Sequence, residues 1–280
     1  MDIVNAFSVD LEDYFMVTAF SRSVKYEDWG RFEDRVEGGT RKLLALLARH
    51  DTRATFFVLG WIAERRADLV REIHDAGHEI ASHGYNHRMV HEMTMEEFRA
   101  DVRRSKAVLE DAIGGRIQGY RAPSYSITEK TLWALGILEE EGFSYDSSIF
   151  PIRHDRYGYP GFSRFPVKVA GEGNGGGIFE IPLSTIRIGG QNIPVAGGGY
   201  FRLYPAAVTV WAIRRLNESE KQPVVFYIHP WELDPDQPRM PAGRLTQLRH
   251  RLNIGTTERK LGALLERVRF GPVRDLVDLA

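Results

Sequence analysis

Two histidines four residues apart are the clearest chemical signal in this sequence. His83 and His87 follow residues 79–82, a short apolar stretch that is typical of a strand. If the next residues form a helical turn, both imidazoles lie on one side of it and can bind one divalent metal ion. The chain has 9 histidines, and a pair on a solvated surface is an equally good interpretation. The rest of the sequence has to separate the two interpretations.

Polar residues also stand at the ends of other predicted strands. Residues 10–13, Asp-Leu-Glu-Asp, end the first strand, Arg121 follows a strand near residue 119, and His229 follows one near residue 226. Each has a plain structural explanation, as a helix cap, a surface ion pair or a turn residue. Carboxyl ends of parallel strands meet at one edge of a sheet, however, so the joint placement favours a single site.

These residue types point to hydrolysis of an amide. Two histidines and one carboxylate leave positions open on a zinc-like ion, which is typical of a catalytic site. A second carboxylate can then take a proton from water, while an imidazole across the pocket protonates a leaving amine. Thiol chemistry is excluded because the chain has no cysteine, and neither a GxSxG motif nor a phosphate-binding loop occurs.

The elements that must position these residues alternate along the chain. Strand-length apolar runs alternate with segments of helical period, which predicts an α/β fold with a largely parallel sheet. The predicted strands cover residues 6–9, 54–59, 78–82, 117–120, 143–145, 178–188 (a strand or hairpin) and 224–228. The predicted helices cover residues 42–47, 62–76, 94–113, 130–141, 206–216 and 260–268. Residues 150–177 predict a long irregular loop, which in a compact domain is usually functional or mobile.

Composition sets the outer limits. A chain of 280 residues can bury a sizeable core, as one barrel with an appendage or as two domains. With 37 basic and 38 acidic side chains the net charge is −1, so no overall field favours nucleic acid or an anionic membrane. No leader pattern and no apolar window of transmembrane length occurs, so we expect a soluble, cytoplasmic protein. The oligomeric state is not predicted.

Five motifs, in this order, carry a resemblance to a known family. They are residues 8–13, His83 with His87, residues 121–125, residues 146–151 and residues 226–229. Together they resemble the polysaccharide deacetylases with a NodB homology domain, carbohydrate esterase family 4. Within that family the chain is most similar to the branch encoded with bacterial exopolysaccharide and exosortase loci. The resemblance covers nearly the whole chain.

The resemblance implies roles for the first two motifs. Asp10 is the expected catalytic base, and His83 and His87 are expected metal ligands. The third ligand is Glu12 or Asp13, because the motif carries one extra residue. We favour Glu12, since the strand period places it on the same face as Asp10.

The later motifs imply the remaining catalytic groups. Arg121 is expected to hold the base, and the backbone amide of Ser124 or Tyr125 to stabilise the oxyanion. His229 is the expected general acid, and Asp146 is expected to orient it. Gly84 stands where the family has a hydroxyl residue, and Phe150 stands where it usually has Trp.

The resemblance implies a distorted (β/α) barrel of about seven strands with long insert loops. We expect one domain over residues 1–280, with a family-specific portion over about 150–280. The expected activity is removal of N-acetyl groups from amino sugars of a bacterial polysaccharide or its precursor. The expected cofactor is one divalent metal, with zinc first and cobalt, nickel or manganese as alternatives. No nucleic-acid partner is expected.

Four further side chains are candidates to stack on or hydrogen-bond sugar rings, although aromatic residues in loops are more often part of a core. They are Tyr157, Tyr200, Arg202 and Trp231. Two other functions stay open. One is hydrolysis of a cyclic ureide or a formamide on the same fold, which a comparison of substrates would separate. The other is a non-catalytic carbohydrate-binding relative, which would retain no metal.

Overall fold

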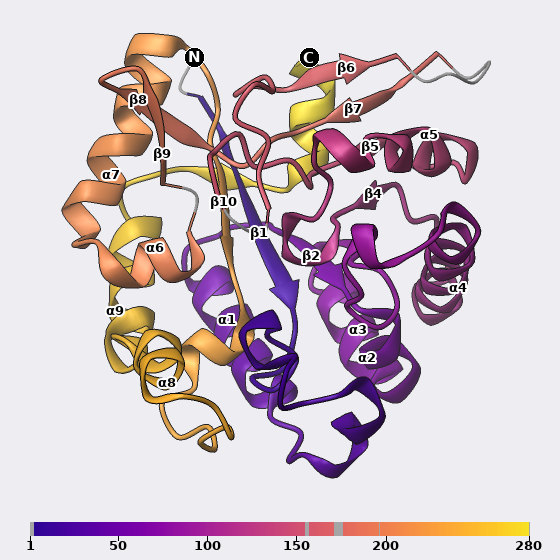
Figure 1. The fold of residues 1–280 in the computed structure, drawn as a ribbon. Coiled ribbons are helices and arrows are strands. Elements are labelled where there is room, and N and C mark those ends of the chain that lie inside the picture. Colours follow the sequence, from indigo (N-terminus) through magenta and orange to yellow (C-terminus); the bar gives the residue numbers. More distant parts are fainter. Residues whose placement is uncertain (1–2, 155–156, 171–175, 196, 280) are drawn as a thin grey trace.

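One curled sheet organises the protein (Figure 1). The computed structural model describes residues 3–154, 157–170, 176–195 and 197–279. The strand order is β10-β1-β2-β3-β4-β5-β7-β6, and β11 also pairs with β1. From β10 to β7 every neighbouring pair is parallel, which gives seven parallel strands, and only β6 runs antiparallel. The predicted α/β class is confirmed, with the sheet curled into a half-barrel.

The strands are short and buried near the centre of the sheet. Their bounds are β1 Asn5–Leu11, β2 Thr55–Val58, β3 Glu79–Ser82, β4 Gly119–Tyr120, β5 Tyr145–Asp146, β6 Val167–Val169, β7 Ile178–Glu180, β10 Val225–Ile228 and β11 Phe270–Gly271. A separate antiparallel hairpin consists of β8 Thr185–Ile188 and β9 Gln191–Pro194. All seven residues of β1 are buried, as expected of a parallel strand covered on both faces.

Helices cover the sheet on two sides. The helices are α1 Val36–Arg49, α2 Gly60–Arg65, α3 Ala67–Asp75, α4 Met95–Ile113, α5 Trp133–Glu140, α6 Gly198–Leu203, α7 Ala206–Arg215, α8 Arg244–Arg251 and α9 Ile254–Leu265. In Figure 1, α2 to α5 lie together on the right and α6 to α9 on the left. Shorter turns are η1 Thr18–Phe20, η2 Tyr26–Arg31, η3 Val90–Glu92, η4 Pro123–Tyr125, η5 Glu129–Thr131, η6 Leu216–Glu220, η7 Pro230–Leu233 and η8 Val273–Leu279.

Helix α4 shows why sequence signals placed the long helices well. Thr94 Oγ1 accepts a hydrogen bond from the Glu97 amide, and the Thr94 amide donates one to the Glu97 carboxylate, forming the predicted capping box. The predicted inward stripe of Phe98, Val102, Ser105 and Leu109 is buried. Gly114 ends the helix in the left-handed conformation that glycine adopts without strain.

Three departures from the predicted secondary structure have a clear physical cause. The helix expected over residues 62–76 is two helices, because Arg66 has non-helical dihedral angles. Residues 244–251 form a helix that was not predicted, because they lie at the surface and His250 alone among them is buried. The long loop contains β6, a half-buried edge strand whose three residues, Val-Lys-Val, are too few for their alternation to predict a strand.

Both halves of the chain contribute to the same sheet. β1 lies between β2, which follows it in sequence, and β10, which comes some 220 residues later. At the other side of the sheet, β5 pairs with β7. Among the described residues, no helix has the length and apolar character needed to cross a membrane.

Candidate active site

The polar residues at the strand ends meet at the carboxyl edge of the sheet. Glu12 Oε1 lies 3.1 Å from His83 Nε2 and 3.0 Å from His87 Nε2. All three side chains are nearly excluded from solvent. The two histidines do not share a helical turn, because Gly84 and His87 both have positive φ. The imidazoles still converge, but through a loop rather than a helix.

This cluster fits a divalent metal. Among the described residues, one ligand atom from each of Glu12, His83 and His87 lies within 4.8 Å of the others. His83 Nδ1 is 2.8 Å from the carbonyl oxygen of Arg121, a contact that holds the ring with Nε2 facing Glu12. Three donors of this kind leave further positions open on a zinc-like ion.

Asp13, the alternative ligand, forms hydrogen bonds to backbone amides instead of joining the histidines. Its Oδ2 accepts hydrogen bonds from the amides of Arg35 and Val36, at 2.7 and 3.0 Å, and so caps the start of α1. Its other oxygen accepts from the amide of Tyr14. Glu12 is therefore the carboxylate that the structure places with the histidines.

The electrostatics of Glu12 suit a ligand that must be ionised. Burial alone would raise its pKa, but the charges and hydrogen bonds of His87 and His83 outweigh burial. The pKa of Glu12 is thus held well below its usual range. A metal ion at the same position would favour the carboxylate in the same way.

Asp10 is held firmly beside this cluster. Its Oδ1 is 2.6 Å from Arg121 Nη1, and its Oδ2 accepts a hydrogen bond from the Tyr125 hydroxyl at 3.2 Å. Arg121 is fully buried and also donates to Ser8 and to the backbone and side chain of Ser147. A guanidinium held by four hydrogen bonds fixes the carboxylate that it pairs with.

His229 faces Asp10 and Glu12 from the end of β10. Its Nε2 is 3.9 Å from Asp10 Oδ2 and 4.0 Å from Glu12 Oε1. Its Nδ1 is 2.9 Å from Oε1 of Glu232, a fully buried residue of η7. Burial would lower the pKa of His229, but the Glu232 hydrogen bond and the nearby carboxylates raise it to about 9. The imidazole is therefore kept protonated.

Glu232, and not Asp146 as the sequence predicted, is the carboxylate that contacts His229 Nδ1. Asp146 is fully buried, accepts a hydrogen bond from Ser148 and lies in register with Glu180 across β5 and β7. Burial and the nearby charge of Asp146 raise the pKa of Glu180 well above its usual range. Asp146 thus supports the loop that holds Arg121 and not His229. Sequence reasoning missed Glu232, although it stands three residues after His229.

Two of the four sugar-binding candidates lie inside the protein. The Trp231 ring stacks between His229 and His250, with centroids 5.1 and 4.5 Å away, and is 6% exposed. Arg202 is 5% exposed and donates to backbone carbonyls, including that of His250 at 2.7 Å. Its guanidinium lies over the Trp231 ring. These residues form the wall behind His229 and offer no open surface to a sugar.

The other two candidates are partly exposed and lie near the base. The Tyr157 ring stacks on Phe150, the Tyr200 ring meets Phe150 edge-on, and Tyr157 also contacts Tyr125. The amide of Tyr125 donates to the Ala122 carbonyl at 3.1 Å, so it is already engaged in the turn. The adjacent Ser124 and Tyr125 both have positive φ, a strained conformation that is concentrated at functional sites.

Gly84 fits its position for a backbone reason. Its φ of +74° favours glycine, and its amide donates to Ser82 Oγ at 3.2 Å. Its carbonyl accepts from Ser105 Oγ at 2.9 Å. The hydroxyl groups of Ser82 and Ser105 thus support the loop at the position where the family's own hydroxyl residue is absent.

The structure thus combines a parallel half-barrel with two histidines, two carboxylates and a third histidine at its carboxyl edge. Residues 29–140 match the polysaccharide deacetylase family, and residues 147–278 match a domain of unknown function, DUF3473. The chain thus carries a polysaccharide deacetylase region over residues 29–140, followed by a DUF3473 region over residues 147–278.

Curated relatives cover part of the chain. A peptidoglycan deacetylase of Helicobacter pylori is 32% identical over 113 residues, which are 40% of this chain and 38% of that protein. A peptidoglycan-N-acetylglucosamine deacetylase of Bacillus cereus is 33% identical over 96 residues, 34% of this chain and 35% of that protein. The chain therefore spans less than half the length of these relatives.

Solved structures share the fold over nearly the whole chain. A Mycobacterium smegmatis structure described as a polysaccharide deacetylase has a TM-score of 0.59 at 23% identity, covering 100% of this chain and 94% of that one. An allantoinase has a TM-score of 0.61 at 16% identity, covering 98% and 88%. A Bacillus anthracis pseudoenzyme of carbohydrate esterase family 4 has 0.51 at 14%, covering 99% and 66%. At these identities the likeness establishes the fold alone.

Proposed function

We propose that this protein removes N-acetyl groups from amino sugars of a bacterial polysaccharide or its precursor. One observation carries the proposal: Asp10 and His229 lie beside the same cluster of Glu12, His83 and His87. That arrangement provides a base and an acid next to three metal ligands. The family match favours an acetamide over other amides.

A divalent metal held by Glu12, His83 and His87, with zinc as the expected ion, would polarise the acetyl carbonyl and make water a stronger nucleophile. Asp10, fixed by Arg121 and Tyr125, accepts a proton as water attacks the carbonyl carbon. The hydrogen bonds from Arg121 and Tyr125 hold the Asp10 carboxylate in place while it accepts the proton.

The leaving nitrogen needs a proton when the carbon–nitrogen bond breaks. His229 carries that proton on Nε2, and Glu232 holds the imidazole through Nδ1. The products are acetate and a free amino sugar, and the proton accepted by Asp10 balances the one donated by His229. Because the Tyr125 amide is engaged, the Ser124 amide is the backbone donor left to stabilise the oxyanion.

We also propose that the chain is one catalytic domain. The DUF3473 region supplies His229, Glu232 and the strand that pairs with β1. An N-acetylated glycan is the proposed partner, and Tyr157 and Tyr200 are the proposed contacts for its rings.

The deciding experiment is acetate release from N-acetylated oligosaccharides by zinc-loaded protein, with and without chelator. We expect release that chelator abolishes, and none from Asp10→Asn. Allantoin in a parallel assay tests ureide hydrolysis, and faster turnover of allantoin would contradict the proposal. A metal content near zero after loading with zinc or cobalt would instead favour a non-catalytic carbohydrate-binding protein.

A further inference from the structure

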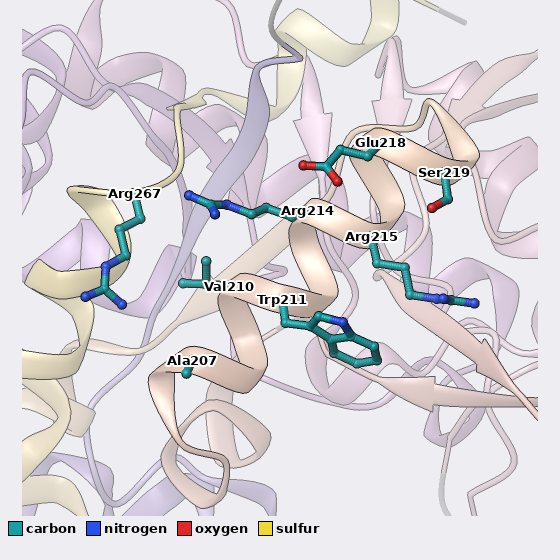
Figure 2. Close-up of a pocket in the computed structure, with 8 residues that line it drawn as sticks. All are labelled: Ala207, Val210, Trp211, Arg214, Arg215, Glu218, Ser219 and Arg267. Carbon is teal, nitrogen blue, oxygen red and sulfur yellow. The ribbon is translucent and has the colours of Figure 1, made fainter.

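A basic groove lies far from the catalytic cluster, along α7. We call it the α7 groove; it measures about 620 Å³ and is lined by Ala207, Val210, Trp211, Arg214, Arg215, Glu218, Ser219 and Arg267 (Figure 2). An adjoining cavity of about 600 Å³ shares Arg214, Glu218 and Arg267 and adds Lys221 and Arg269. Arg214 reaches from α7 toward the segment after α9 that carries Arg267 (Figure 2).

The charges of the groove are nearly all of one sign. Five cationic side chains line the two cavities, and Glu218 is their one carboxylate. None of the five cations forms an ion pair within the part of the chain that the structure describes. Glu220, the next carboxylate along the chain, is paired with Arg164 at 2.6 Å. The fold therefore leaves these cations available to an external anion.

The groove also presents an aromatic surface. The Trp211 side chain is 50% exposed, although tryptophan is usually well buried in a monomeric protein. It lies one helical turn before Arg214 and Arg215, on the solvent face of α7. A flat indole packs against the C–H face of a pyranose ring, and a guanidinium binds a carboxylate through two parallel hydrogen bonds.

We propose that the α7 groove is a second glycan-binding site, which takes an acidic polysaccharide strand bearing carboxylate groups such as those of uronates. Cations in a groove together with an exposed indole match the alternating charge and ring faces of such a strand. A membrane surface is flat and would leave the concave part of the groove unfilled. The proposal goes beyond the deacetylase function and does not require it.

The α7 groove lies at the opposite end of β1 from the catalytic cluster. Asn5, at the start of β1, lines the adjoining cavity, whereas Asp10 and Glu12 stand at the end of that strand. The seven residues of β1 span about 20 Å, so the groove and the catalytic cluster lie at opposite ends of the strand. A polymer bound at the groove is held near the protein without occupying the active site.

The test is equilibrium binding of an oligogalacturonate of about eight rings, followed by calorimetry and by tryptophan fluorescence. This probe has no acetamide, so its binding is independent of the proposed hydrolysis. The fully methyl-esterified oligomer has the same rings without charge. We expect binding of the acid and not of the ester, and weaker binding as salt is raised.

The matched variants are Arg214→Gln with Arg267→Gln, and Arg116→Gln as the control. Arg116 is an exposed arginine after α4. Since the two groove arginines are exposed and unpaired, the double variant should keep the wild-type unfolding temperature. We expect about 10-fold weaker binding in the double variant and no change in the control.

Three results would overturn the proposal. The first is no binding of the acidic oligomer by wild type. The second is equal binding by wild type and the double variant. The third is binding to vesicles containing phosphatidylglycerol with none to the oligomer, which would make the surface a membrane contact. Trp211→Ala should remove the fluorescence change and weaken binding several-fold.

Discussion

Replacing Glu232 tests the chemistry of the acid histidine most directly. Glu232 is fully buried, and its Oε1 lies 2.9 Å from His229 Nδ1. A hydrogen bond to a charged group contributes about 1.5–3 kcal/mol. If that energy is realised when His229 donates its proton, Glu232→Ala lowers kcat by about 10- to 150-fold.

The pH profile separates this effect from a loss of packing. His229 must be protonated to act as an acid, so activity falls as pH rises through its pKa. Glu232 raises that pKa, and Glu232→Gln removes the charge while an amide oxygen can still accept from Nδ1. The fall in kcat/KM should therefore begin at lower pH in the Gln variant than in wild type.

Acetate release under saturating substrate, with metal content measured in the same samples, is the assay. Asp236→Asn changes an exposed carboxylate in the same segment and should leave kcat unchanged. Asp146→Asn should also retain kcat within a few-fold, because its side chain faces Ser148 and Glu180. The reasoning is refuted if Glu232→Ala keeps wild-type kcat while Asp146→Asn loses it.

Two further predictions concern the metal and acid stability. His83→Ala should lose both bound metal and activity, whereas His229→Ala should retain metal and lose turnover, as metal analysis and acetate release would show; metal loss in both variants would contradict the separate roles. Burial lowers the pKa of His78 from 6.5 to about 4, and its Nδ1 accepts from the Ala54 amide. Only the unfolded chain gains that proton at first as pH falls, so unfolding free energy should drop between pH 6.5 and 4, by at most about 3 kcal/mol. Urea unfolding of His78→Asn should show a weaker pH dependence, and an unchanged one would remove His78 as the cause.

Much of this site could be predicted from the local periodicity of the sequence. The alternation of a strand puts Glu12 on the face of Asp10, and in the structure Glu12 is the carboxylate that meets His83. The parallel arrangement of neighbouring strands then brings the ends of β1, β3 and β10 to one edge. Those relations follow from short stretches of sequence, so they were accessible without coordinates.

Relations that depend on distant partners were not accessible. Asp146 matches a family motif, but its neighbour is Glu180, which lies 34 residues away and meets it only through the register of β5 and β7. Glu232 reaches His229 because residues 230–233 form a tight turn, and nothing in the composition of that turn predicts its direction. Arg202 was predicted to face a ligand, whereas the fold uses it to bind carbonyl groups of the segment around His250.

The central position of β1 has a consequence for how such a protein can arise and be divided. The two regions matched by family models meet along β1, with β2 on one side and β10 on the other. A chain that stopped before β10 would leave β1, the strand of Asp10, with an unpaired edge and would lack His229. On our proposal that the chain is one domain, the DUF3473 region is not an exchangeable module, and the two regions have to be expressed and engineered together.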